Sequence, residues 1–159
     1  AFLASLSVGE NIALPLRERG RLSEFDIVRK VEDALEAVGL AGEADKMPGE
    51  LSGGMLKRAS LARALVRNAD IMLYDEPTSA LDPVTARQVN ALIAETNRKR
   101  GITSIVVTHD LAAALGYADR IMMLKDGRIR ALAAPGEFAK SPDEAVKEFL
   151  EASFHEKIG

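Results

Sequence analysis

The sequence of 159 residues contains no cysteine, and its apolar residues never run on for long. Without cysteine the chain forms no disulfide and performs no thiol chemistry, which is typical of proteins in a reducing compartment such as the cytosol. Its longest apolar runs, such as Ile71-Met-Leu-Tyr74 and Ile105-Val-Val107, fall far short of the roughly twenty residues that a membrane-spanning helix needs. We therefore expect any role at a membrane to depend on a partner protein.

The overall composition is that of a soluble globular protein of one-domain size, with 47% hydrophobic and 28% charged residues. A net charge of −3 argues against a general nucleic-acid-binding protein. The chain begins Ala1-Phe2-Leu3, with neither an initiator methionine nor a signal-type segment. We expect it to be a fragment whose beginning is missing.

The first fifty residues show helical patterns. Ser7 and Glu10 have the spacing of a capping box, which predicts a short helix that starts at Val8 and ends before Pro15. Ser23 is placed to cap a longer helix that ends at Gly39. One face of that helix is expected to be buried, and its apolar residues are Ile27, Val28, Val31, Leu35 and Val38. The polar stretch 42–50 is a plausible hinge.

The remainder alternates strands and helices. Residues 70–75 are predicted to form a strand buried on both faces, and residues 103–108 a second strand. The helix between them starts at Asp82 and ends at Gly101, so the two strands are predicted to be parallel. The later elements are a helix after Asp110, a hairpin turning at Asp126-Gly127 and a final helix capped by Ser141-Pro142 with Glu144.

The stretch Leu51-Ser-Gly-Gly-Met55 precedes a helix-forming run that extends to Val66. Unpaired N–H groups and the positive end of the helix dipole make such a helix start suitable for an anion, and a phosphate would fit there. The alternative is an ordinary N-cap in which Ser52 accepts from a backbone N–H.

Two predicted strand ends carry polar groups at the sheet edge where ligands bind. Asp75 closes the first strand and is suited to orient Mg²⁺, while Glu76 follows it and is suited to polarise a water molecule. The second strand ends at Thr108-His109-Asp110, which places an imidazole at the same edge. A helix cap or surface charge for the acidic pair, and a structural role for His109, are the alternatives.

Four stretches together resemble the ATP-binding subunit of ABC transporters, and the resemblance covers nearly the whole chain. They are Leu51-Ser-Gly-Gly-Met55, Leu73-Tyr-Asp-Glu-Pro-Thr-Ser-Ala-Leu-Asp82, Val106-Val-Thr-His-Asp110 and Ala118-Asp-Arg-Ile-Met-Met-Leu-Lys-Asp-Gly-Arg128. The resemblance implies an α/β, P-loop NTPase-like (RecA-like) parallel-sheet core that lacks its N-terminal part, with an α-helical subdomain. It also implies ATP hydrolysis coupled to transport, with ATP and Mg²⁺ as cofactors.

By that resemblance, site roles fall on three groups of residues. Glu76 is the general base, His109 the switch histidine that contacts the γ-phosphate, and Asp75 the magnesium-binding aspartate. The expected nucleotide-binding residues are those of the signature, Leu51, Ser52, Gly53, Gly54 and Met55, together with Ser79 and Asp82 of the D-loop.

The same resemblance implies partners and a division of the chain. Residues 1–50 correspond to the helical subdomain and the segment facing the membrane partner, and residues 51–159 to the signature helix and the C-terminal part of the core. The expected partners are a second ATPase subunit in a head-to-tail dimer and transmembrane permease subunits, without nucleic acid. The expected location is peripheral, on the cytoplasmic face of the inner or plasma membrane.

Two departures from the family pattern stand out. Met55 replaces the usual glutamine. Together with the stretches Asn11-Ile-Ala-Leu-Pro-Leu16 and Lys57-Arg58, it looks like the subgroup that serves lipid importers of the Mla and Mce-linked type. Methionine lacks the amide hydrogen bonds of glutamine. The chain also contains no Gly-x-x-x-x-Gly-Lys-Ser/Thr, the loop that cradles the phosphates. We expect the chain alone to be inactive. The alternatives are a non-catalytic truncated interaction module and a soluble ABC-type ATPase acting on DNA or ribosomes.

Overall fold

The computed structural model describes residues 2–155, with the backbone alone for Phe154 and His155, and divides into the compact units Ala1–Val107 and Thr108–Gly159. The first unit contains α1 (Val8–Arg17), α2 (Glu24–Ala37), the 3-10 turn η1 (Pro48–Glu50), α3 (Gly53–Leu65), β1 (Ile71–Asp75), α4 (Pro83–Arg100) and β2 (Thr103–Val107). The second contains α5 (Leu111–Tyr117), β3 (Ile121–Lys125), β4 (Arg128–Ala133), α6 (Pro135–Phe138) and α7 (Glu144–His155).

Helix α1 starts with the predicted capping box. The hydroxyl of Ser7 accepts from the N–H of Glu10 at 3.2 Å, and the Glu10 carboxylate accepts from the N–H of Ser7 at 2.7 Å. The prediction that this helix ends before Pro15 is wrong, because α1 continues to Arg17. A proline inside a helix costs about 3 kcal/mol. Several buried apolar side chains, each contributing roughly 1.5–3 kcal/mol, offset that cost.

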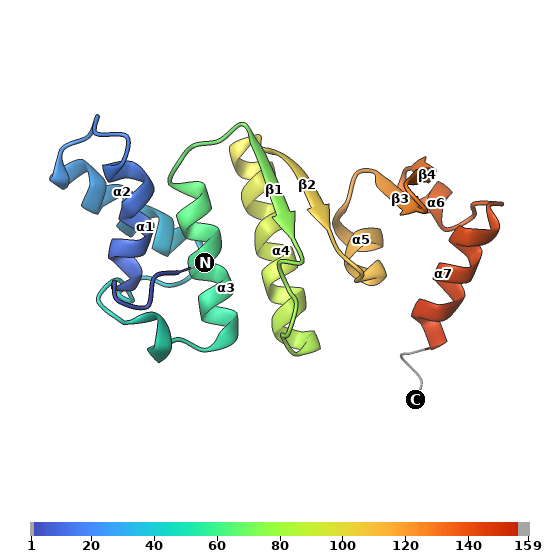
Figure 1. The fold of residues 1–159 in the computed structure, drawn as a ribbon, viewed down its shortest axis with the longest axis horizontal. Coiled ribbons are helices and arrows are strands. Elements are labelled where there is room, and N and C mark those ends of the chain that lie inside the picture. The colour runs from blue at the N-terminus through green and yellow to red at the C-terminus, as the bar shows by residue number, and fades with distance from the viewer. Residues whose placement is uncertain (1, 156–159) are drawn as a thin grey trace. The chain divides into compact units, whose positions relative to one another are not determined.

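Helices α1, α2 and α3 pack against one another in the first unit (Figure 1). Their shared core includes Val8, Ile12, Leu35 and Leu65, all almost fully buried. Val28 was expected on the buried face of α2 but is 51% exposed. Because successive helix residues are 100° apart, the face centred on Ile27, Val31 and Leu35 leaves Val28 at its margin.

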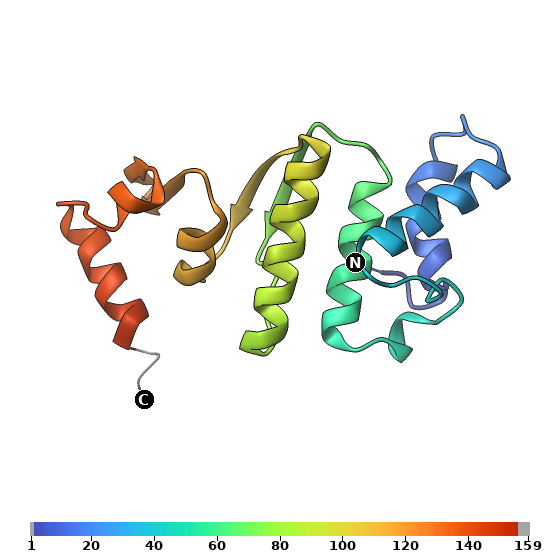
Figure 2. The same ribbon diagram turned by 180° about the vertical axis from the view of Figure 1, so that it is seen from behind.

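Strands β1 and β2 pair in parallel, from Ile71 opposite Thr103 to Asp75 opposite Val107, as predicted. Between them α4 starts at the predicted N-cap Asp82 and ends at Gly101, whose φ of 65° requires a left-handed conformation that glycine adopts readily. Figure 2 shows α4 lying along one face of the two strands. This arrangement places the carboxyl ends of both strands at one edge.

The prediction that β1 is buried on both faces is wrong for the described chain. Met72 is 6% exposed and belongs to the same core as Val89 and Ile93 of α4, whereas Leu73 is 75% exposed. Ile105, which pairs with Leu73, is also exposed. Alternate residues of a strand point to opposite faces, and α4 covers only one of them.

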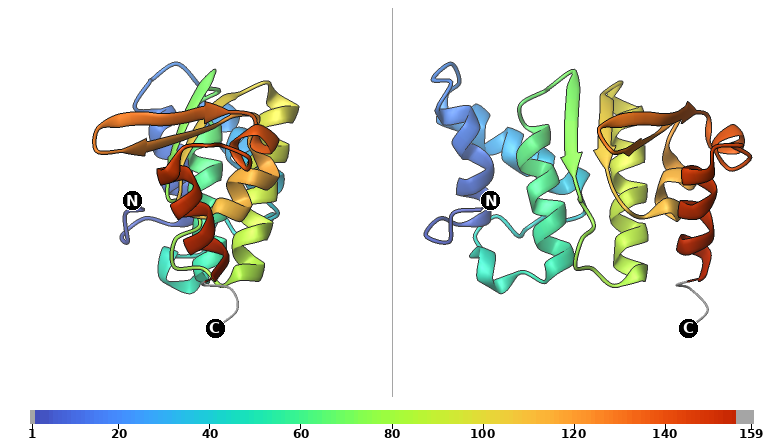
Figure 3. Two further views of the ribbon diagram at one scale, coloured as in Figure 1. Left: turned by 90° about the vertical axis from the view of Figure 1, so that its right-hand side faces the viewer. Right: turned by 45° about the vertical axis from the view of Figure 1, so that its right-hand side comes forward.

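The second unit is built around an antiparallel hairpin, which Figure 3 shows beside α7. The hairpin turns at Asp126 and Gly127, with φ of 54° and 70°, as the Asp-Gly pair predicts. Its small core is centred on Leu111, Phe138 and Val146. The predicted last helix is present, but Asp143 caps it in place of the predicted Ser141, by accepting from the N–H of Ala145 at 2.9 Å.

Candidate functional site

The stretch Leu51–Met55 forms the entry to α3. Leu51 follows the turn η1, Ser52 is the N-cap, and both glycines lie within the helix. The hydroxyl of Ser52 accepts from the N–H of Met55 at 3.3 Å, so the N-cap arrangement considered from the sequence is present. The other N–H groups of the first turn have no intrahelical acceptor, which leaves the helix start suited to an anion.

No side chain larger than that of glycine fits at position 54 without a shift of its neighbours. A Cβ on Gly54 would lie 2.5 Å from Cγ2 of Thr85 in α4, whereas a Cβ on Gly53 would make an ordinary contact with Leu81 at 3.5 Å. Neither glycine has a positive φ. The second glycine therefore lets the start of α3 approach the start of α4, a reason that the sequence pattern did not reveal.

Asp75 and Glu76 are at the carboxyl end of β1. Asp75 is the last residue of the strand and pairs with Val107. The N–H of Glu76 donates to the carbonyl of Val107 at 2.9 Å, and a φ of 44° at Glu76 turns the chain away from the strand. Positive φ is unfavourable for a residue with a Cβ, so the surrounding contacts hold this conformation. The backbone of both acidic residues is thus held in place at the edge of the sheet.

Asp82 caps α4. Its carboxylate accepts from the N–H groups of Val84 and Thr85, each at 3.0 Å. Hydrogen bonds from Thr85, first from its side chain and then from its backbone, lower the pKa of Asp82 below its ordinary value of 3.8. The loop from Glu76 to Asp82 is thereby anchored at both ends.

Lys57 lies in this region, and the sequence assigned it no role in the site. Its Nζ lies 3.1 Å from Oγ of Ser79 and 3.4 Å from the carbonyl oxygen of Glu76. A lysine in the second turn of a helix is common on protein surfaces, and only the folded arrangement reveals that it reaches a loop after β1. It connects the signature helix to the loop that carries the acids.

His109 belongs to the second unit. It is exposed and precedes Asp110, whose carboxylate accepts from the N–H of Ala113 at 3.1 Å and caps α5. The first unit brings together the other predicted positions, which are Leu51 to Met55, Asp75, Glu76, Ser79 and Asp82. In the part of the chain that the structure describes, no group of three or more His, Cys, Asp or Glu residues gathers to hold a metal ion.

The sequence profile of a family described as "ABC transporter" matches residues 1–79. The intermembrane phospholipid transport system ATP-binding protein MlaF of Escherichia coli K12 is 40% identical over 151 residues, which are 95% of this chain and 56% of that protein. The methionine import ATP-binding protein MetN of Haemophilus ducreyi is 36% identical over 157 residues, which are 98% of this chain and 45% of that protein. This chain belongs to the ABC transporter family of ATP-binding proteins.

A solved structure of the family has the same fold. It is the dimeric, post-hydrolysis state of the ATP-binding cassette MJ0796 bound to ADP and Pi, which matches with a TM-score of 0.73 at 35% identity. The match covers 84% of this chain and 59% of that one. The predicted α/β, P-loop NTPase-like fold with a parallel sheet is therefore confirmed. The chain spans about half the length of these curated relatives, 56% of MlaF and 45% of MetN.

Proposed function

We propose that the whole protein is the ATP-hydrolysing subunit of an ABC transporter and drives transport through partner subunits in the membrane. The observation that carries this proposal is the contact, within the first unit, between the start of α3 and the loop after β1. Gly54 approaches Thr85, and Lys57 reaches Glu76 and Ser79. These contacts hold the signature turn and the loop that carries Glu76 together in one unit, so that both can serve the ATP sites of a dimer.

In this proposal Glu76 is the general base that orients the attacking water, and His109 contacts the γ-phosphate. Phosphoryl transfer requires little covalent chemistry from the protein, so positioning and electrostatics account for most of the catalysis. The N–H of Glu76 donates a hydrogen bond to the carbonyl of Val107 at 2.9 Å, which fixes the backbone of Glu76. This supports the role, because a base has to be held within hydrogen-bonding reach of its water.

Asp75 is proposed to bind Mg²⁺ together with the nucleotide. Magnesium takes one or two protein carboxylates and fills its other positions with water and phosphate oxygens. Asp75 offers one carboxylate at the end of a strand, which fits that preference. When bound, the ion neutralises charge on the phosphates, and Asp75 holds it at the sheet edge.

A second ATPase subunit is proposed to complete the site in a head-to-tail dimer. This chain has the signature turn but no phosphate-cradling Gly-x-x-x-x-Gly-Lys-Ser/Thr. Ser52, Gly53 and Gly54 of one subunit then face ATP held by the other, with Leu51 and Met55 flanking them and Ser79 and Asp82 at the subunit contact. The dimeric state of the related cassette, bound to ADP and Pi, supports this arrangement.

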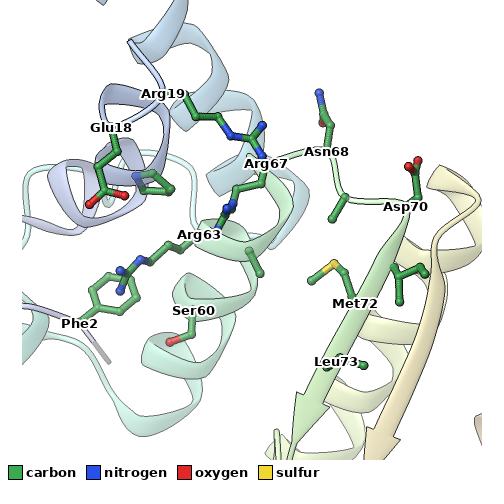
Figure 4. A pocket seen from close by; sticks show the side chains of 14 residues that line it. Phe2, Glu18, Arg19, Ser60, Arg63, Arg67, Asn68, Asp70, Met72 and Leu73 are labelled. Carbon is green, nitrogen blue, oxygen red and sulfur yellow. The ribbon is translucent and has the colours of Figure 1, made fainter. Parts of the chain in front are cut away.

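Residues 1–50 are proposed to form the part that faces the permease subunits. A cavity of about 760 Å³ lies in the first unit, lined by Phe2, by the end of α1, by the second half of α3 and by the start of β1 (Figure 4). The guanidinium of Arg63 lies 5.9 Å from the centre of the Phe2 ring, within the range of a cation–π contact. The lining combines this aromatic ring with both basic and acidic side chains, among them Glu18 and Asp70, and a cavity of this size can receive a segment of a partner.

The proposed location is peripheral, at the cytoplasmic face of the membrane. None of the described helices is long and apolar enough to cross a bilayer. A lipid cargo is supported by Met55 and by the likeness to MlaF, although MetN matches to a similar degree. The cargo is tested by reconstituting the transporter in vesicles and measuring ATP-dependent movement of labelled phospholipid and of labelled methionine.

The test of the proposed function is Glu76→Gln in the whole protein. The amide keeps the size of the side chain but cannot accept the proton, so ATP turnover should be lost while ATP binding and dimer formation persist. Glu36→Gln, on an exposed position of α2, is the matched control and should hydrolyse ATP normally. Normal turnover by Glu76→Gln would show that Glu76 is not the base.

The chain of 159 residues by itself is expected to behave differently. It has no lysine-containing phosphate loop, so we propose that it binds nucleotide weakly, hydrolyses none and acts at most as an interaction module. Isothermal titration with ATP and Mg²⁺, together with a phosphate-release assay, tests this. A turnover that Glu76→Gln abolishes would contradict it.

A further inference from the structure

Lys57 connects α3 to the loop that carries Glu76. Its half-buried side chain brings Nζ to 3.1 Å from Oγ of Ser79 and 3.4 Å from the carbonyl oxygen of Glu76. An ammonium group donates up to three hydrogen bonds and accepts none, so both oxygens are acceptors. The partners are 19 and 22 residues away in the sequence, so this is a tertiary contact.

The loop that Lys57 contacts has an unfavourable backbone. Glu76 has a φ of 44° and Ala80 a φ of 62°, although both residues carry a Cβ. In this left-handed region the Cβ crowds the following carbonyl, which is why most residues avoid it. Two such residues so close together persist only where neighbouring contacts hold them.

Contacts hold the loop from two sides. On the side of the sheet, the N–H of Glu76 donates to the carbonyl of Val107 at 2.9 Å. On the side of α3, Lys57 donates to the carbonyl of Glu76. The N–H of Ser79 donates to the same carbonyl at 3.2 Å, and the Ser79 hydroxyl accepts from Lys57. The peptide groups of Glu76 are thus fixed between the strand and the signature helix.

We propose that Lys57 is a positioning residue that couples the start of α3 to the general base. Through its hydrogen bonds the ammonium fixes the carbonyl of Glu76 relative to the first turns of α3 and thereby sets where the base lies. The proposal rests on the proposed function, because it takes Glu76 as the base. Lys57 acts through the backbone of Glu76 and does not itself touch the reacting atoms.

The first experiment measures amide hydrogen exchange in the full chain. Lys57→Met removes the ammonium but keeps an unbranched apolar stem, so α3 should fold normally. Exchange at the N–H groups of Ser79 and Leu81 should become about tenfold faster, because a charge-assisted hydrogen bond that restrains the loop is lost. Lys57→Arg should retain the protection, and Lys140→Met, at an exposed position, should leave it unchanged.

A double-mutant cycle with Ser79→Ala tests whether the contact is direct. In the Ser79→Ala background, Lys57→Met should accelerate exchange at Leu81 less than it does in the wild-type chain, because one acceptor is already gone. Unchanged protection of Ser79 and Leu81 in Lys57→Met, or effects that simply add in the cycle, would overturn the proposal.

The second experiment measures ATP turnover in the whole protein. Lys57→Met should lower kcat about tenfold or more, because a misplaced base loses reactivity steeply with distance. KM for ATP should stay within about twofold, and Lys57→Arg should recover most of kcat. An unchanged kcat despite faster exchange would refute the positioning role. If the wild-type protein hydrolyses no ATP, the proposed function fails, and exchange alone decides whether Lys57 holds the loop.

Discussion

A Cβ added to Gly54 would lie 2.5 Å from Cγ2 of Thr85, so the first turns of α3 and α4 meet where no larger side chain fits. Gly54→Ala should therefore destabilise the first unit by about 1–3 kcal/mol through overpacking, despite the better helix propensity of alanine. Denaturant unfolding of the full chain measures this effect.

Two variants make that measurement specific. Gly53→Ala should be neutral or slightly stabilising, because its Cβ would meet Leu81 at an ordinary 3.5 Å. Thr85→Ser removes Cγ2 and keeps the hydroxyl, so it should restore much of the stability lost in Gly54→Ala. Equal losses for the two alanine variants would mean that Thr85 does not limit the space.

Asn11 holds the residues before α1 in place from a fully buried position. Its side-chain oxygen accepts from the N–H of Leu3 at 2.7 Å, and its amide nitrogen lies 3.0, 3.0 and 2.9 Å from the carbonyls of Leu3, Leu6 and Ser7. Asn11→Ala should cost about 1–3 kcal/mol, because the N–H of Leu3 and the carbonyl of Leu6 lose their hydrogen bonds to Asn11, whereas the carbonyls of Leu3 and Ser7 still accept from backbone N–H groups.

Asn90 provides the matched control for Asn11, since its amide nitrogen is buried without a hydrogen-bond partner among the described residues. Asn90→Ala removes an unsatisfied donor from a helix and should change stability by less than about 1 kcal/mol. Chemical unfolding of both variants checks the contrast, and similar losses would contradict the hydrogen-bond explanation.

Asp82 should make the stability of the first unit depend on pH at acidic pH values. Because hydrogen bonds from Thr85 lower its folded pKa below 3.8, its contribution is present above that pH and is lost as pH falls through the folded pKa. Asp82→Asn keeps a capping oxygen without this titration, so its Tm should fall less steeply below about pH 4. Asp33→Asn, at an exposed position of α2, should follow the wild-type curve.

Tyr74 should make the stability of the first unit fall as pH rises in the alkaline range. Burial, only partly compensated by the hydrogen bond to Asn97 at 3.1 Å, raises the pKa of Tyr74 above its ordinary value of 10.0. The contribution of this group to stability is present below that value and lost as pH rises through the folded pKa. Tyr74→Phe should therefore lose less stability between neutral pH and pH 11 or so, as alkaline unfolding curves would show. Identical curves would argue against this assignment.

Local chemistry made much of the fold predictable. Asp82 followed by Pro83 predicts a helix start, Gly101 a helix end, and Asp126-Gly127 a hairpin turn, because each depends on neighbours in the sequence. Pro15 did not follow its local rule, since packing of α1 against α2 and α3 outweighed one lost hydrogen bond. Leu73 did not follow the strand pattern, because α4 covers only one face of the sheet.

For the candidate site, too, the sequence predicted the local motifs but not the tertiary contacts. The order of the motifs identified the residues from Leu51 to His109 that resemble the family, but not the contacts that join them. No role in the site was predicted for Lys57 or Thr85, because their contacts arise from the approach of α3 to the loop after β1 and to α4, which no local pattern encodes. The roles of the site residues remain predictions, and the experiments on Glu76 and Lys57 address them.

The open face of β1 and β2 also governs how the chain behaves at the bench. Leu73 and Ile105 sit side by side in a parallel pair, 75% and 54% exposed, and an exposed apolar sheet face of this kind is prone to self-association. The purified chain should therefore bind hydrophobic dyes such as ANS in its native state and precipitate as its concentration rises. Leu73→Thr keeps β-propensity while reducing the exposed apolar area, so it should make the purified chain more soluble.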